Sequence, residues 1–130
     1  MGARRRVAFA AASGVLALDL GDEMLVPTSF HHPRSAAALA LTAVLAFGVL
    51  WAVPRVPSRV LALAGGVAAG GALGNLVSGL LWSSGVPDPI VHGGYAFNVA
   101  DVAVVLGDAA LLTTALVVAW DHRHRLHAPV

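Results

Sequence analysis

The sequence predicts an all-α membrane protein: one domain, residues 1–130, folded as a four-transmembrane-helix bundle with both termini in the cytoplasm. Hydrophobic residues make up 58% of the chain and charged residues only 12%, whereas soluble domains average about half and about a quarter. Four long apolar segments are separated by breaks that contain proline, and the arginines gather at alternate breaks. Because the chain has too few charged residues to cover a surface exposed to water, this single domain is expected to lie in lipid.

The four apolar segments cover about residues 7–25, 36–53, 60–82 and 97–120. A helix needs about 17–25 apolar residues to cross a bilayer, so each segment qualifies and the second is the shortest. Prolines follow the first three segments, and proline ends a helix because it lacks an amide donor and clashes with the preceding turn. These prolines are Pro27, Pro33, Pro54, Pro57, Pro87 and Pro89.

The arginines orient the predicted bundle. Seven of the eight lie before the first segment, between the second and third, or after the fourth, whereas Arg34 follows the first segment. The seven are Arg4, Arg5, Arg6, Arg55, Arg59, Arg123 and Arg125. Basic residues are enriched on the cytoplasmic side of membrane proteins, so these parts of the chain are predicted to be cytoplasmic. The connections 26–35 and 83–96 then face outward.

The composition excludes several kinds of site and partner. The chain has no cysteine, which excludes disulfides, thiol catalysis and cysteine-based metal sites. A formal net charge of +1 is too small to indicate a nucleic-acid partner. His122, His124 and His127 lack the spacing of a helical metal motif, so a solvated tail is expected and no metal or cofactor is predicted.

Small residues recur every four positions in the third segment, at Gly66, Gly70, Gly74 and Ser78. Such a stripe lets helices approach closely in lipid, where no hydrophobic force drives them together. The stripe therefore predicts a helix-packing face.

Acidic and amide side chains gather where the segments reach the outer face. Charges inside spanning segments are costly, so they are expected to face the bundle interior. The group consists of Asp19 in the first segment, Asn75 and Ser78 in the third, Asp88 in the outer connection, and Asn98, Asp101 and Asp108 on one face of the fourth. Two carboxylates that meet at one interface cannot both ionise easily, so Asp88 and Asp101 indicate a functional site.

Two motifs in this region resemble the paired signature of the lipoprotein signal peptidases, also called signal peptidase II, a family of aspartic peptidases. They are GGALGNL at residues 70–76 and FNVAD at residues 97–101. The resemblance implies that Asp88 and Asp101 are the catalytic acids. It also implies that Asn75, Asn98 and Asp19 support the acids and bind substrate.

The resemblance further implies an activity and a location. An enzyme of this kind cleaves the signal peptide of a lipid-modified prolipoprotein in the bacterial cytoplasmic (inner) membrane, so its partners are that signal peptide and membrane lipid. One carboxylate removes a proton from water while the protonated one polarises the scissile carbonyl, which is general acid–base hydrolysis without a covalent intermediate.

The sequence departs from the family pattern at several positions. Ser78 and Gly79 stand where the family has Asp-Arg, Glu23 where it has Lys, and Arg34 where it has Asn. The short outer connection after the first segment leaves little room for the β-cradle that the family builds outside the membrane. His92, four residues after Asp88, is a candidate to tune that acid.

Two further functions remain open from the sequence. The departures are compatible with a divergent non-catalytic relative that binds a lipoprotein or another membrane protein. Asp108 has no counterpart in the family pattern and, with Asp19 and Asp101, favours a small proton-relay or transport protein.

Overall fold

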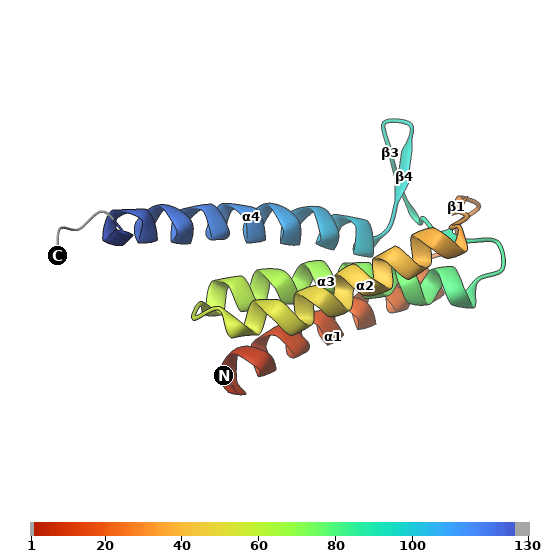
Figure 1. Ribbon diagram of the computed structural model, residues 1–130. Coiled ribbons are helices and arrows are strands. Elements are labelled where there is room, and N and C mark those ends of the chain that lie inside the picture. The colour runs from red at the N-terminus through yellow and green to blue at the C-terminus, as the bar shows by residue number, and fades with distance from the viewer. Residues whose placement is uncertain (1, 127–130) are drawn as a thin grey trace.

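The computed structural model describes residues 2–126, apart from the side chains of residues 122 and 124–126, and it is mostly helical, which confirms the all-α class. The four long helices are α1 (Gly2–Leu25), α2 (Ala36–Ala52), α3 (Arg59–Leu81) and α4 (Val99–Leu126), and a 3₁₀ turn, η1 (Val53–Arg55), follows α2 (Figure 1). Serine side chains cap the N-termini of α2 and α3. The hydroxyl of Ser35 accepts from the N–H of Ala38, and that of Ser58 accepts from the N–H of Leu61.

Three of the helices are long and apolar enough to cross a membrane, at Ala36–Arg55, Arg59–Leu81 and Val99–Asp121. The sequence predicts four such spans, and α1 falls short because both of its ends are charged. Its least charged stretch of 18 residues, 7–24, still contains Asp19, Asp22 and Glu23. Asp19 and Glu23 are buried within the protein, so α1 hides part of this charge against its neighbours.

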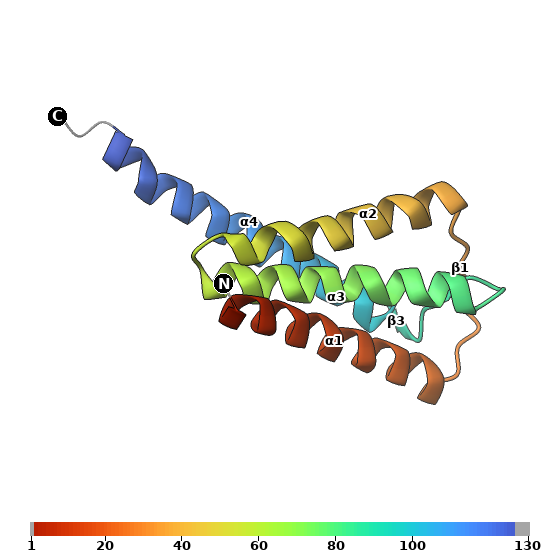
Figure 2. The same ribbon diagram turned by 60° about the horizontal axis from the view of Figure 1, so that its bottom comes forward.

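α3 lies at the centre of the bundle and packs against each of the other three helices. Eleven of its 23 residues are buried, against four of 24 in α1, as expected for a helix with neighbours on several sides. Figure 2 shows α1 and α2 on either side of α3, with α4 crossing behind them. The other helices therefore hold their places mainly through α3.

The small-residue stripe of α3 is a packing face. Gly66 lies against the backbone of Ala8 and Gly70 against that of Ala12, both in α1, and a Cβ added at either glycine would overlap that backbone. Gly71 approaches the backbone of α4 in the same way on another side of the helix. Close backbone approach of this kind gives the dispersion contacts that hold helices together in lipid.

Four short strands form two small sheets at one end of the bundle. β1 (His31–His32) pairs antiparallel with β2 (Val86–Pro87), and β3 (Ile90–His92) pairs antiparallel with β4 (Tyr95–Phe97). Two small sheets thus form although the connection after α1 is short. The first sheet needs only two residues from each connection, because its strands come from different connections.

Glycines shape both sheets. Gly93 and Gly94 turn the β3–β4 hairpin with positive φ angles of 57° and 84°, as a two-residue hairpin turn requires. Gly85 has a φ of 103°, and a Cβ there would overlap the backbone of His32.

The strands lie at one end of the bundle, while the start of α1 and the end of α4 lie at the other (Figure 1).

The glycine contacts predict a clear difference between two conservative substitutions. Gly70→Ala forces a methyl group into the backbone of α1 and is expected to destabilise the bundle by about 1–3 kcal/mol. Gly14→Ala in α1 is the matched control, because no atom lies within 4 Å of its added Cβ; we expect it to be neutral or stabilising. Thermal unfolding in detergent micelles measures both, and equal midpoints for the two variants would contradict this packing.

Candidate active site at the strand-bearing end of the bundle

The start of α4 is held by two side-chain oxygens. Asn98 is fully buried, and its Oδ1 accepts from the backbone N–H of Asp101 at 2.8 Å. Asp19, also fully buried, accepts at Oδ1 from the backbone N–H of Ala100 at 2.7 Å. Such oxygens satisfy N–H groups that have no partner within the helix, and negative charge is favoured there. Together they fix the first turn of α4, which carries Asp101.

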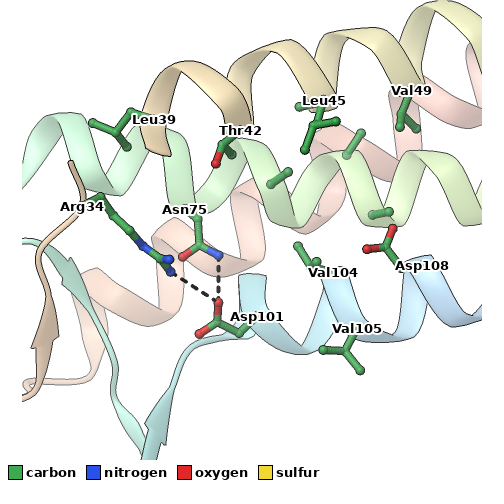
Figure 3. A pocket seen from close by; sticks show the side chains of 14 residues that line it. Arg34, Leu39, Thr42, Leu45, Val49, Asn75, Asp101, Val104, Val105 and Asp108 are labelled. Atoms are coloured by element: carbon green, nitrogen blue, oxygen red, sulfur yellow. Dashed lines mark hydrogen bonds and ion pairs between the residues drawn. The ribbon is translucent and has the colours of Figure 1, made fainter. Parts of the chain in front are cut away.

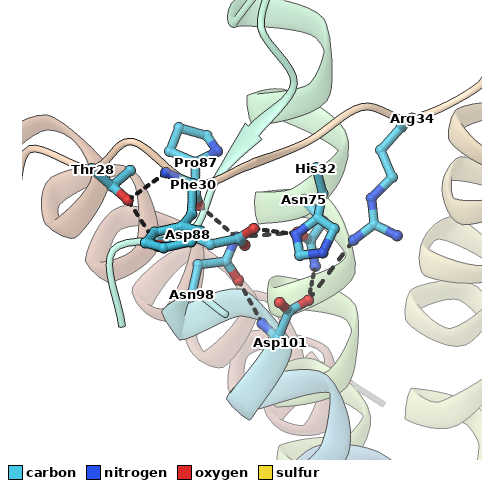
Figure 4. A network of polar contacts seen from close by, with 9 residues as sticks. All are labelled: Thr28, Phe30, His32, Arg34, Asn75, Pro87, Asp88, Asn98 and Asp101. Atoms are coloured by element: carbon cyan, nitrogen blue, oxygen red, sulfur yellow. Dashed lines mark hydrogen bonds and ion pairs between the residues drawn. The ribbon is translucent and has the colours of Figure 1, made fainter. Parts of the chain in front are cut away.

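Asn75 and Asn98 connect the candidate acid on α4 to the strand segment that precedes Asp88 (Figure 4). Asn75 donates through Nδ2 to Oδ1 of Asp101 at 2.9 Å. Asn98 donates through Nδ2 to Oδ1 of Asn75 at 3.2 Å and to the backbone carbonyl of Pro87 at 3.3 Å. The amides therefore join α3, α4 and β2 in one hydrogen-bond network.

Asp88 follows β2 and is held on both sides of its backbone. Its N–H donates to the carbonyl of Phe30 at 3.0 Å, and its own carbonyl accepts from Oγ1 of Thr28 at 3.0 Å. The side chain is 1% exposed. Oδ2 is in contact with Nδ1 of His32, whereas Oδ1 is buried without a hydrogen-bond partner.

The surroundings of Asp88 raise the pKa of its carboxyl group. Burial is the largest cause, because it disfavours the charged form, and the nearby charge of Asp101 acts in the same direction. The hydrogen bond and charge of His32 lower the pKa but do not outweigh burial. Asp88 is thus the kind of group that retains a proton more readily than an ordinary aspartate.

Asp88 and Asp101 belong to one network but face different spaces. Among the described residues no hydrogen bond joins their carboxyl groups directly, and the connection runs through the two asparagines. Asp101 lines a cavity of about 600 Å³ between α2, α3 and α4 (Figure 3). Asp88 lines a second cavity of about 380 Å³ between β1 and the β3–β4 hairpin.

The larger cavity is mainly apolar, with polar groups placed along one side. Asn75, Asp101 and Arg34 lie together at one end, where Nη2 of Arg34 is 4.0 Å from Oδ1 of Asp101. Asp108 lies farther along the same cavity, which Thr42 of α2 also lines (Figure 3). The remaining wall is formed by aliphatic side chains, among them Leu39, Leu45, Val49, Val104 and Val105.

A second polar cluster lies beside the network. Glu23 of α1 is buried and accepts through Oε2 from Oγ of Ser78 at 2.6 Å and from Nε1 of Trp82 at 3.2 Å. Gly79, the next residue of α3, lies under the Arg34 side chain, whose Cγ is 3.8 Å from the position of an added Cβ.

The structure thus brings together all five site residues predicted from the sequence, and it adds two that sequence reasoning missed. His32, and not His92, is the histidine in contact with Asp88, and His92 lies on β3. Glu23 joins Ser78 across 55 positions of the chain. Among the described residues no cluster of three or more metal-ligating side chains occurs, and the histidines of the C-terminal tail fall outside the described side chains.

These features define a helical membrane protein with two hydrogen-bonded aspartates, Asp88 and Asp101, at one end of its bundle. The sequence matches the family described as Signal peptidase (SPase) II over residues 12–117. Because that match covers most of the chain, the protein belongs to this family of membrane proteases, whose role is lipoprotein processing. No solved structure matches the chain significantly.

Two curated relatives illustrate the similarity. The chain is 39% identical over 83 residues to the lipoprotein signal peptidase of Methylorubrum extorquens (strain PA1), covering 61% of this chain and 47% of that protein. It is 34% identical over 87 residues to the lipoprotein signal peptidase of Rhodopseudomonas palustris (strain ATCC BAA-98 / CGA009), covering 61% and 53%. The chain spans about half the length of these relatives.

The cap on α4 predicts different outcomes for two replacements of Asp19. Asp19→Ala removes the acceptor of the Ala100 N–H and should destabilise the protein by about 0.5–2 kcal/mol. Asp19→Asn keeps an oxygen at the same place and should lose much less. Unfolding midpoints of the two variants and the parent protein in detergent test this, and equal losses for Asn and Ala would mean that the hydrogen bond is not what stabilises α4.

Proposed function

We propose that this protein is a signal peptidase II-type aspartic endopeptidase that cleaves the signal peptide of lipid-modified prolipoproteins in the bacterial cytoplasmic membrane. The observation that carries the proposal is the network that joins Asp101 to the backbone next to Asp88 through Asn75 and Asn98. Two acids held in one network at the end of a membrane bundle suit hydrolysis of a peptide bond near the membrane surface.

The surroundings of the two acids suggest separate roles. Asp101 accepts a hydrogen bond from Asn75, lies near the guanidinium of Arg34 and lines the larger cavity. We assign Asp101 as the general base that removes a proton from water. The raised pKa of Asp88 suits it to keep its proton and polarise the scissile carbonyl. As Asp101 takes the proton, the water oxygen bonds to the carbonyl carbon. The tetrahedral intermediate then collapses by breaking the C–N bond, and the amine leaves with the proton that Asp101 took from water.

The substrate assignment is supported by the larger cavity. A signal peptide is an apolar helix, and the aliphatic wall between α2 and α4 offers it a complementary surface that ends at Asp101. The smaller cavity beside Asp88 then receives the chain on the other side of the scissile bond. In this proposal membrane lipid surrounds the bundle and also contacts the lipid attached to the substrate.

The proposed topology places all four helices in the membrane and both termini in the cytoplasm. Its support is the distribution of the arginines, seven of which fall at the end of the bundle opposite the strands. α1 is less apolar than the others, but its buried Asp19 and Glu23 face the protein and not the lipid.

A second candidate function is a proton relay. It is favoured by one observation, that Asp108 lines the same cavity as Asp101. Ionisable groups inside spanning helices often mark proton pathways.

The two candidate functions make opposite predictions for Asp88 and Asp108. Asp88→Asn and Asp101→Asn should each reduce cleavage by roughly 10²–10⁴-fold without unfolding the bundle, because Asn keeps the shape but cannot transfer the proton. Asp108→Asn is the matched control and should cleave almost normally. The assay is cleavage of a diacylglyceryl-modified prolipoprotein in detergent, followed on a gel. Loss of function in Asp108→Asn, with Asp88→Asn active, would favour the relay instead.

The topology is tested with single thiols, because the chain has no cysteine of its own. Pro57→Cys and Tyr95→Cys place one exposed thiol at each end of the bundle. A membrane-impermeant maleimide should label residue 95 on intact spheroplasts and residue 57 only after permeabilisation. The reverse labelling pattern would show that the protein has the opposite orientation in the membrane.

A further inference from the structure

The connection between α1 and α2 carries two side chains that reach the two candidate acids (Figure 4). His32 contacts Oδ2 of Asp88, and Nη2 of Arg34 lies 4.0 Å from Oδ1 of Asp101. The two residues are separated by Pro33 in a segment that begins as strand β1. Side chains two positions apart in extended chain point to the same side, which explains how one short segment serves both acids.

His32 reaches a buried acid from the surface. Its side chain is 55% exposed, whereas that of Asp88 is 1% exposed. The pairing of β1 with β2 sets His32 opposite Val86, two residues before Asp88, so the backbone register determines the contact. The same connection also holds the Asp88 backbone through the carbonyl of Phe30. The imidazole occupies Oδ2, and Oδ1 is left as the oxygen that can carry a proton.

Arg34 reaches its acid over a position without a side chain. Its Cγ lies 3.8 Å from where a Cβ of Gly79 would be, an ordinary contact distance, whereas that Cβ would overlap Cδ2 of Leu39 at 2.8 Å. The guanidinium then approaches the same Asp101 oxygen that accepts from Asn75. It lines the end of the larger cavity, beside the acid.

We propose that His32 and Arg34 are positioning residues, each of which holds one acid by one oxygen and so fixes how that carboxyl group is oriented. The inference rests on the proposed peptidase function and deepens it. His32 fixes the Asp88 carboxyl so that Oδ1 bears the acid proton. Arg34 holds the Asp101 carboxyl, the proposed base, through Oδ1. Neither residue contacts the scissile bond.

The charged and titratable groups around Asp88 set the direction of the expected pH effect. They are His32 and Arg34 from the connection, Asp101 from α4 and Glu23 from α1, and His31 and Tyr95 line the same cavity as Asp88. Burial raises the pKa of Asp88, and the hydrogen bond from His32 lowers it. Removal of the imidazole therefore raises this pKa further. Since the proposed acid works while protonated, the alkaline limb of the activity profile should move to higher pH.

The first experiment compares three variants of the full chain in the prolipoprotein cleavage assay. His32→Phe should lower kcat by roughly tenfold and move the alkaline limb of kcat/KM to higher pH. His32→Gln keeps a donor at this position and should recover much of the loss. His92→Asn is the matched control, a histidine near Asp88 in sequence but on strand β3. A profile for His32→Phe that matches the parent enzyme would overturn the proposal, as would a shift of the acid limb alone.

A second comparison separates positioning from substrate binding at Arg34. Arg34→Met should lower kcat while KM changes less than twofold, and Arg34→Lys should restore part of kcat because the charge remains. A rise in KM with unchanged kcat would show that the guanidinium binds the substrate and would overturn its assignment as a positioning residue.

A readout without catalysis distinguishes failure of this inference from failure of the proposed function. The chain has six aspartates, and ¹³C labelling of their carboxyl groups allows Asp88 to be followed by NMR, with its signal assigned by its absence in Asp88→Asn. In His32→Phe the titration midpoint of Asp88 should move upward. If the parent protein cleaves nothing but this shift occurs, the peptidase assignment fails and the role of His32 stands. No shift would refute the role of His32 whether or not the protein cleaves.

Discussion

The backbone N–H groups at the start of α4 determine where one of the two candidate acids lies. A helix leaves its first N–H groups without internal partners, and here Asp19 of α1 takes one and Asn98 another. Asp19 can reach this place because Gly74 of α3 has no side chain. A Cβ at that position would overlap the Asp19 carboxylate. One contact among three helices thus sets both the packing of α4 and the position of Asp101.

Burial of acids is the main electrostatic constraint on this end of the protein. Asp19, Glu23 and Asp88 are each buried, and each has one carboxyl oxygen in a hydrogen bond and one without a partner. A buried carboxyl group is costly unless donors are aimed at it. The donors come from the Ala100 backbone, the Ser78 hydroxyl, the Trp82 indole and the His32 imidazole. The strand-bearing end is therefore a set of directed hydrogen bonds enclosed by apolar helices.

Two departures from the family signature become intelligible through their neighbours in space. Ser78 stands where the signature has an acid, and the carboxylate of Glu23 is bonded to it. Gly79 stands where the signature has an arginine, and the side chain of Arg34 passes over it. A carboxylate and a guanidinium therefore lie beside these two positions, although both come from other parts of the chain.

The grouping of Asp19, Asn75, Asp88, Asn98 and Asp101 was predicted from the arginine-based topology and from the motif resemblance. The helical class, the proline-bounded segments and the small-residue packing face could be predicted from the sequence alone. These features depend on local composition and on helical periodicity, which a single chain displays directly. The contact of His32 with Asp88, the bond of Glu23 to Ser78 and the pairing of β1 with β2 were decided only by the tertiary structure. Each of these joins residues more than 50 positions apart, and no local pattern encodes which distant partner a polar group will meet when helices close around it. The donors to Asp19 and Glu23 of α1 likewise come from α3 and α4.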